Sequence, residues 1–230
     1  MKKLKLYIAG KVSPNSVFGR HDWRDEFCSK LAELSGFEFA NLDPTKSHED
    51  FDLDENNGKL IFGRDCFLIK SADLIIVNLT DDISVGGSQE MLIAKYYQKP
   101  LIGIASKGGK FFKEEKEILG KIYKNWTHPF VSVPCDTVVE NINEVADFIK
   151  NFFSKPENSV KDMEVLDKAL KYYKEHHHKD DQFLHNLCYE INFFKREFRH
   201  RNNGNLHRCH PNWQKLAKMA KRGTVPFLFR

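Results

Sequence analysis

The sequence predicts an open, doubly wound α/β fold, with a parallel sheet of about five strands and a helical C-terminal appendage. Two observations predict it. Short apolar runs alternate with stretches of helical periodicity up to residue 153, and the links between them are short. The run 72–79 is rich in β-branched residues, which is typical of a central parallel strand buried on both faces. Ligands bind beyond the carboxyl ends of such strands, so one crevice is expected at the loops after Ala9, Leu42, Leu79 and Ile104.

The elements are expected in the following order. Strands are predicted at residues 4–9, 37–42, 72–79, 101–104 and 130–133. Helices are predicted at residues 22–34, 59–70, 88–97, 111–123 and 141–153, with further helical periodicity at 160–175 and 182–198. Residues 155–159 have the composition of a linker, Lys-Pro-Glu-Asn-Ser. We therefore expect one domain over residues 1–154 and a basic, helical region over residues 155–230.

Length and composition set the class of protein. The 230 residues are 41% hydrophobic, which is enough for one substantial α/β domain and a smaller appendage. No apolar run approaches the length of a membrane span, and the apolar stretch near the N-terminus is too short for a signal peptide. The five cysteines are odd in number and widely spaced, which favours free thiols in a reducing compartment. The sequence thus predicts a soluble cytoplasmic protein with no membrane partner.

Positive charge is concentrated near the C-terminus. From Lys195 to Arg230 there are ten Lys or Arg residues against one acid, Glu197, although the net charge of the chain is only +4. This tail favours either a nucleic-acid-binding module or, as the preferred alternative, a segment that packs by its aromatic residues. The histidines at 176–178 and the cluster at 207–210 lack the paired spacing of zinc ligands. No metal and no cofactor are predicted.

The segment 81–90 carries the candidate chemistry, because it joins the most buried-looking strand to a helix. Gly86 and Gly87 would let the backbone approach a ligand closely. Glu90 is expected in the first turn of the helix, where the helix dipole favours an anion by about 0.3–1 kcal/mol. An ionised carboxylate suits glycosyl transfer, since it can stabilise an oxocarbenium-like state or form a covalent ester. The alternative is that Glu90 is an ordinary first-turn capping residue.

Several short motifs occur in one order with matching gaps. They are Tyr7-Ile8-Ala9-Gly10, Asp22-Trp23-Arg24, Arg64-Asp65 followed by Lys70-Ser71-Ala72-Asp73, Gly86-Gly87-Ser88-Gln89-Glu90 and Lys99-Pro100. This set resembles the nucleoside 2-deoxyribosyltransferase family, which includes the 2′-deoxynucleoside 5′-monophosphate N-glycosidases. The similarity covers about residues 4–150 and implies that residues 1–154 form a catalytic domain with a flavodoxin- or Rossmann-like sheet.

The resemblance implies roles for three residues. Glu90 would be the nucleophile, Tyr7 would orient it, and Asp65 would contact the base or sugar and help to protonate the leaving base. Substrate contacts are expected from Gly10, Trp23, Arg24, Gly86 and Gly87. Each assignment has a structural alternative: Tyr7 as an ordinary strand residue, Asp65 as a surface acid, Trp23 as a core residue, and Arg24 as a partner of a loop acid such as Asp43.

The residue six positions before Glu90 bears on the substrate. Family members that use free nucleosides carry Asp there, and the monophosphate hydrolases carry Ser; this chain has Ser84. A hydroxyl can donate to a phosphate that a carboxylate would repel. Lys11 and Ser13 could supply further donors, although the Gly-Ser-x-Arg pattern of the family's glycosidase is absent.

We therefore predict hydrolysis of a ribo- or deoxyribonucleoside 5′-monophosphate that releases the free base. One alternative is base exchange between nucleosides by a deoxyribosyltransferase. A further alternative is a nucleotide- or nucleic-acid-binding module without chemistry. The resemblance also implies a homodimer or larger homo-oligomer in which a neighbouring subunit finishes each site, and the exposed-looking aromatics Tyr96, Tyr97, Phe111 and Phe112 could form that contact.

Overall fold

The computed structural model describes residues 3–10, 23–46, 54, 56–80, 82–155 and 158–184. The chain divides into two compact units, Met1–Leu170 and Lys171–Arg230. The predicted boundary at residues 154/155 stays a prediction. Lys11 and Ser13, the helix predicted at 182–198 beyond residue 184, and the basic tail lie outside the described residues.

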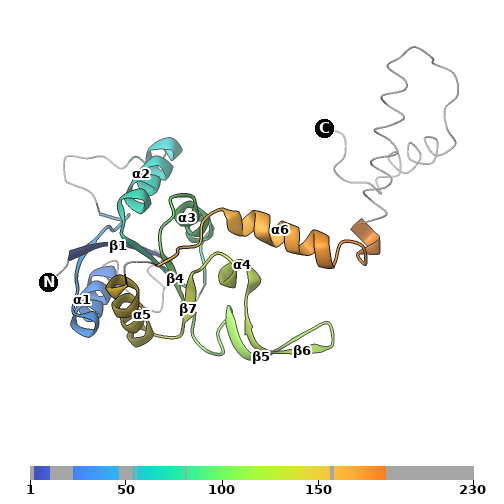
Figure 1. Cartoon of the computed structure of the whole chain (residues 1–230). Helices are drawn as coiled ribbons and strands as arrows, with labels where there is room; N and C mark the ends of the chain where they lie inside the picture. Colours follow the sequence, from blue (N-terminus) through green and yellow to red (C-terminus); the bar gives the residue numbers. More distant parts are fainter. Residues whose placement is uncertain are drawn as a thin grey trace, which may run out of the picture. The chain divides into compact units, whose positions relative to one another are not determined.

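Five parallel strands form the central sheet, which confirms the predicted fold class (Figure 1). In spatial order they are β2 (Glu38–Asn41), β1 (Lys3–Ala9), β3 (Leu74–Asn78), β4 (Leu101–Ile104) and β7 (Thr137–Val139). Leu6 of β1 pairs with Leu74 of β3, and Ile75 of β3 pairs with Leu101 of β4. Because every strand runs in the same direction, all their carboxyl ends meet at one edge of the sheet.

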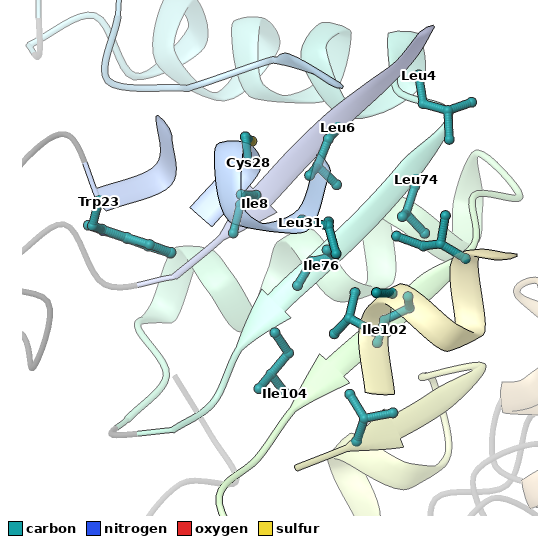
Figure 2. Packing of buried hydrophobic residues seen from close by; sticks show 14 residues of the cluster. Leu4, Leu6, Ile8, Trp23, Cys28, Leu31, Leu74, Ile76, Ile102 and Ile104 are labelled. Atoms are coloured by element: carbon teal, nitrogen blue, oxygen red, sulfur yellow. The ribbon is translucent and has the colours of Figure 1, made fainter. Parts of the chain in front are cut away.

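Two pairs of helices form separate apolar cores with the sheet. The core with α1 (Trp23–Ser35) and α5 (Ile142–Ser154) includes alternate β1 residues such as Leu6 and Ile8. Figure 2 shows Trp23, Cys28 and Leu31 of α1 in this cluster. The core with α2 (Gly58–Ser71) and α3 (Val85–Tyr96) includes the other β1 residues, Tyr7 and Ala9. The two-residue period of a strand therefore directs Tyr7 toward α2 and α3.

A β-hairpin replaces the helix predicted at residues 111–123. It consists of β5 (Phe112–Ile118) and β6 (Lys121–Thr127), which pair in antiparallel fashion. Leu119 and Gly120 form the turn, both with positive φ (51° and 76°). The Lys113–Glu117 run has high helix propensity, but Gly120 breaks a helix at this point and favours a two-residue hairpin turn. Across the strand pair, the Lys116 ammonium lies 3.3 Å from the centre of the Trp126 ring.

The strand predicted at residues 130–133 is also wrong. A short helix, α4 (Pro129–Ser132), occupies this position, and proline in its first turn suits a helix start. The fifth strand is β7, which forms instead at Thr137–Val139. Helix α6 spans Glu164–His176 and accounts for most of the helical periodicity predicted at 160–175. Among the described helices, none is both long enough and apolar enough to cross a membrane.

A buried ion pair links α3 to Asp136, which in turn contacts the start of β4. The Lys95 ammonium is fully buried and lies 2.5 Å from the Asp136 carboxylate. The same carboxylate oxygen accepts from the Leu101 backbone N–H at 2.7 Å, and the other oxygen accepts from the Lys161 N–H at 2.7 Å. Burial lowers the pKa of Lys95, while Asp136 opposes that shift.

Replacing Lys95 with Met should lower the free energy of unfolding by about 3–5 kcal/mol, because the Asp136 carboxylate stays buried without its cation. Urea denaturation followed by circular dichroism measures this change. Lys150→Met is the matched control, since Lys150 faces Asp147 at 3.8 Å on the surface and should contribute less than about 1 kcal/mol. Equal effects of the two substitutions would contradict the prediction.

Candidate active site

Tyr7 and Glu90 meet at the centre of the candidate site. The Tyr7 hydroxyl donates a hydrogen bond of 3.0 Å to Oε1 of Glu90. Tyr7 is fully buried in the core between β1, α2 and α3, so its ring has little freedom to move. Strand β1 and helix α3 thus bring together two residues that are 83 positions apart in the sequence.

Glu90 lies in the second turn of α3, so its predicted place in the first turn is wrong. The helix begins at Val85, with Ser84 as the N-cap, and the Ser84 hydroxyl oxygen accepts from the Gly87 N–H at 3.0 Å. Serine is a preferred N-cap residue, and this one starts the helix before the two glycines. The dipole effect falls off within the first turn, so it does not hold Glu90 ionised as expected.

The two glycines give close access to the carboxylate and to the cap. A Cβ atom built on Gly86 would lie 3.7 Å from Oε1 of Glu90. A Cβ atom on Gly87 would lie 3.2 Å from Ile83 Cγ1 and 3.3 Å from the Ser84 hydroxyl. Glycine is therefore needed for space at position 87, where a Cβ atom would crowd Ile83 and the cap hydroxyl, whereas a Cβ atom at position 86 would make ordinary van der Waals contact with the carboxylate.

Burial decides the protonation of the Tyr7–Glu90 pair. It raises the pKa of Glu90 to about 7, although the Tyr7 hydrogen bond and the positive charge of Arg24 act in the opposite direction. The charge of Asp65 raises this pKa further. Burial and the Glu90 charge also raise the pKa of Tyr7, so its hydroxyl stays protonated and remains a donor. Near neutral pH the carboxylate is about half ionised.

Asp65 of α2 belongs to the same electrostatic cluster. It is partly buried, and burial raises its pKa while the neighbouring Arg64 lowers it. Its charge raises the pKa values of both Tyr7 and Glu90. The Arg64 guanidinium donates to the carbonyls of Pro44 and Lys46, so the loop after β2 is held against α2 beside Asp65.

Arg24 is buried where β1 ends. Its Nε donates to the Ile8 carbonyl at 3.0 Å, and its Nη2 donates to the Gly10 carbonyl at 3.1 Å. The structure thus places these donors on backbone carbonyls rather than on Asp43, the alternative partner considered from the sequence. A Cβ atom on Gly10 would lie 3.2 Å from Asn78 Cβ, so glycine allows the ends of β1 and β3 to come close together.

Trp23 packs in the core on the other face of the sheet. It is 4% exposed, and its ring meets Phe27 edge-on at 6.5 Å. Its proposed contact with substrate stays a prediction. Trp23 also lines a pocket of about 350 Å³, which includes Thr80 and Ile104 and so lies at two of the loops where the sequence predicted a crevice. The sequence did not lead us to expect Glu140 and Asn141 in its lining, because the fifth strand was predicted at residues 130–133 and not at β7.

The aromatic residues suggested for a subunit contact differ in exposure. Phe111 is buried and is therefore not an exposed aromatic as expected, while Tyr97 and Phe112 are partly buried. Tyr96 is exposed as predicted. In the part of the chain that the structure describes, no three His, Cys, Asp or Glu residues gather in a way that could hold a metal ion.

No known family model matches the sequence, and no curated protein matches it. Solved structures with a similar architecture include a conserved protein from Enterococcus faecalis V583, 15% identical, with a TM-score of 0.46 over 65% of this chain and 98% of that one. A 2-deoxyribosyltransferase from Bacillus psychrosaccharolyticus is 17% identical, with a TM-score of 0.41 over 62% and 90%. A CMP N-glycosidase from Clostridium botulinum is 14% identical, with a TM-score of 0.34 over 64% and 99%. These likenesses concern the arrangement of strands and helices alone.

Proposed function

We propose that this protein hydrolyses the N-glycosidic bond of a nucleoside 5′-monophosphate, with Glu90 as nucleophile and water as acceptor. The observation that carries the proposal is the hydrogen bond from the buried Tyr7 hydroxyl to the Glu90 carboxylate. A second carboxyl group, that of Asp65, is close enough to raise the pKa of Glu90. Two interacting carboxyl groups with different surroundings suit a nucleophile and a proton donor.

The chemistry follows from these three groups. Tyr7 holds Oε1, so that Oε2 of Glu90 attacks the anomeric carbon and forms an ester while the C1′–N bond breaks. The bonding electrons leave with the base, and the Asp65 carboxyl supplies its proton. Water then attacks the anomeric carbon, gives a proton back to Asp65 and releases the sugar phosphate. Glu90 returns as a carboxylate.

The start of α3 is the proposed phosphate site. The Ser84 hydroxyl oxygen accepts from Gly87, so its own hydrogen can be donated to a phosphate oxygen. Gly86 and Gly87 let the ligand approach the backbone, and a helix N-terminus favours an anion. We propose Gly10, Lys11 and Ser13 as further contacts from the loop after β1.

Ser84→Asp should lower kcat/KM for a 5′-monophosphate by about tenfold or more and affect the free nucleoside less, because a carboxylate repels the phosphate. The measurement is free base released from a panel of ribo- and deoxyribonucleosides and their 5′-monophosphates, separated by chromatography. Ser84→Thr is the matched control, since threonine also caps helices and keeps a hydroxyl.

The same panel distinguishes the alternatives. Equal rates on nucleosides and monophosphates, with exchange when a second free base is added, would support the deoxyribosyltransferase function instead. Saturable binding of nucleotides without turnover would support a binding module. Binding of nucleic acid by the basic tail stays a prediction, and its test is a salt titration of DNA and RNA binding by the full chain.

We also propose that the protein forms a homodimer or larger assembly. Large apolar side chains are exposed on the neighbouring helices α2 and α3. They are Phe62, Phe67, Leu92 and Tyr96. Tyr96→Glu combined with Phe67→Glu should therefore shift the oligomer toward the 26.9 kDa monomer. Light scattering at micromolar concentration measures the mass, and an unmutated protein that is monomeric and fully active would contradict the proposal.

A further inference from the structure

We propose that Arg24 is a positioning residue: its buried guanidinium holds the end of β1 in place and keeps a positive charge near the Tyr7–Glu90 pair. This inference rests on the proposed function, because it assigns Arg24 a role in preparing the nucleophile. The direct substrate contact that the sequence suggested for this residue stays a prediction.

The geometry shows how Arg24 fixes the strand. Only 1% of the residue is exposed, and its two donors reach the carbonyls of Ile8 and Gly10, on either side of Ala9. Ile8 follows Tyr7 directly, so the same clamp restrains the strand segment that carries the Tyr7 ring. A planar guanidinium can satisfy two carbonyls in fixed directions, which the single ammonium of lysine does less well.

Arg24 is unusual as a buried charge. Within the described residues, no carboxylate lies at ion-pair distance from its guanidinium, which contacts the two carbonyls and lies 4.7 Å from the centre of the Trp23 ring. Buried charges are normally paired with an opposite charge, because leaving water is costly. Arginine is always charged, so the guanidinium that holds Ile8 and Gly10 also brings a positive charge into the interior beside the strand that carries Tyr7.

Among the described residues, the charged and titratable groups around Glu90 come from three elements. Tyr7 of β1 donates a hydrogen bond, Asp65 of α2 adds negative charge, and Arg24 of α1 adds positive charge. Burial is the largest influence on the pKa of Glu90 and favours the protonated carboxyl, as does the charge of Asp65, whereas the Tyr7 hydrogen bond and, to a smaller extent, the charge of Arg24 favour the carboxylate. Arg24 therefore helps to keep the nucleophile ionised inside an apolar site.

The test separates the charge of Arg24 from its packing. Arg24→Met removes the charge and keeps an unbranched side chain, so the titration midpoint of Glu90 should rise. For every pH unit by which the midpoint rises, the ionised form at low pH should fall about tenfold. Arg24→Lys keeps the charge, so it should leave the midpoint near its original value while lowering the plateau rate at high pH. Lys30→Met is the matched control, because Lys30 is an exposed cation on the same helix and should leave the midpoint unchanged.

The midpoint is read in two ways, from the pH dependence of kcat/KM and from ¹³C NMR of the glutamate carboxyls. Glu90→Gln identifies the Glu90 resonance, and the NMR titration needs no substrate. A folded Arg24→Met protein with an unchanged Glu90 midpoint would overturn the inference and leave Arg24 as a packing residue. If Arg24→Met does not fold, Arg24→Gln gives the same comparison, because its amide can still donate to one carbonyl.

A failure of the proposed function can be distinguished from a failure of the inference about Arg24. Normal turnover by Glu90→Gln would overturn the proposed function whatever Arg24 does. Loss of turnover in Glu90→Gln, together with an unmoved midpoint in the uncharged Arg24 variants, would overturn the role of Arg24 alone.

Discussion

Glu90→Ala and Glu90→Gln are each expected to lower turnover by at least about a thousandfold, because neither side chain can form the ester with the anomeric carbon. Activity should be measured as base released from the best 5′-monophosphate under saturating conditions. A 2-fluoro-sugar analogue of that substrate should leave its mass adduct on the peptide that contains Glu90. The Glu90→Gln protein should accumulate no adduct.

Glu90→Gln should also increase the free energy of unfolding at alkaline pH. Burial raises the pKa of Glu90 from its ordinary value of 4.5 to about 7, so the folded state binds this proton more tightly than the unfolded state. Above pH 7 the Glu90 carboxyl therefore lowers the free energy of unfolding, because the folded state must then bury its negative charge. Glu90→Gln removes that cost, and the unfolding free energy at a pH of about 8.5 should rise by about 3 kcal/mol relative to the unmutated protein.

The effect of Glu90→Gln on stability should depend on pH. At a pH of about 5 the Glu90 carboxyl is protonated in the folded state, so Glu90→Gln should change stability much less than at alkaline pH. Urea denaturation at both pH values measures the difference. A variant that loses activity only because it unfolds would contradict the role of Glu90, and so would a variant that keeps near-normal turnover.

The sheet could be predicted from the sequence because its strongest pattern is local. The apolar run that contains β3 is compatible with an extended strand buried on both faces, and β3 is buried along most of its length. Tyr7 follows from the same reasoning, since alternation along β1 directs every second side chain to one face. The approach of Tyr7 to Glu90 could be expected only from the ordered motifs, because the residues lie on separate elements.

The β5–β6 hairpin and the start of α3 could not be predicted correctly, because local sequence signals compete there. Lys and Glu favour a helix at residues 113–117, but the Gly120 turn and the cross-strand contact of Lys116 with Trp126 accompany a hairpin. The sequence suggests only a phosphate donor at Ser84, although the capping role of this residue places Glu90 one turn deeper in α3. That difference reverses the expected electrostatics, because burial, and not the helix dipole, dominates the pKa of Glu90.

Arg24 shows a limit of composition-based reasoning. Arginine in an amphipathic helix is normally expected at the surface, and no periodicity marks a guanidinium that turns inward to backbone carbonyls. The partners, Ile8 and Gly10, contribute main-chain oxygens that every residue type carries. Such a contact becomes visible only when α1 and β1 are placed together.

Asp65→Asn should slow the release of poor leaving bases by about a hundredfold or more, because the amide cannot deliver a proton to the departing ring. Burial raises the pKa of Asp65, so a larger fraction of the carboxyl holds its proton than on an exposed aspartate, and Arg64 limits this effect. A substrate whose leaving group needs no proton, such as a sugar phosphate with a nitrophenolate leaving group, should be affected much less. The ratio of kcat/KM between the two substrates is the measured quantity.

Asp73→Asn is the matched control for Asp65→Asn. Asp73 precedes β3, at the amino edge of the sheet, and its carboxylate accepts from the Lys5 N–H at 2.8 Å. The control substitution removes the same charge far from the carboxyl edge that holds the candidate site, so both substrates should react at near-normal rates. If Asp65→Asn instead slows both substrates equally, Asp65 orients the sugar or supports α2, and the leaving base must obtain its proton from another group.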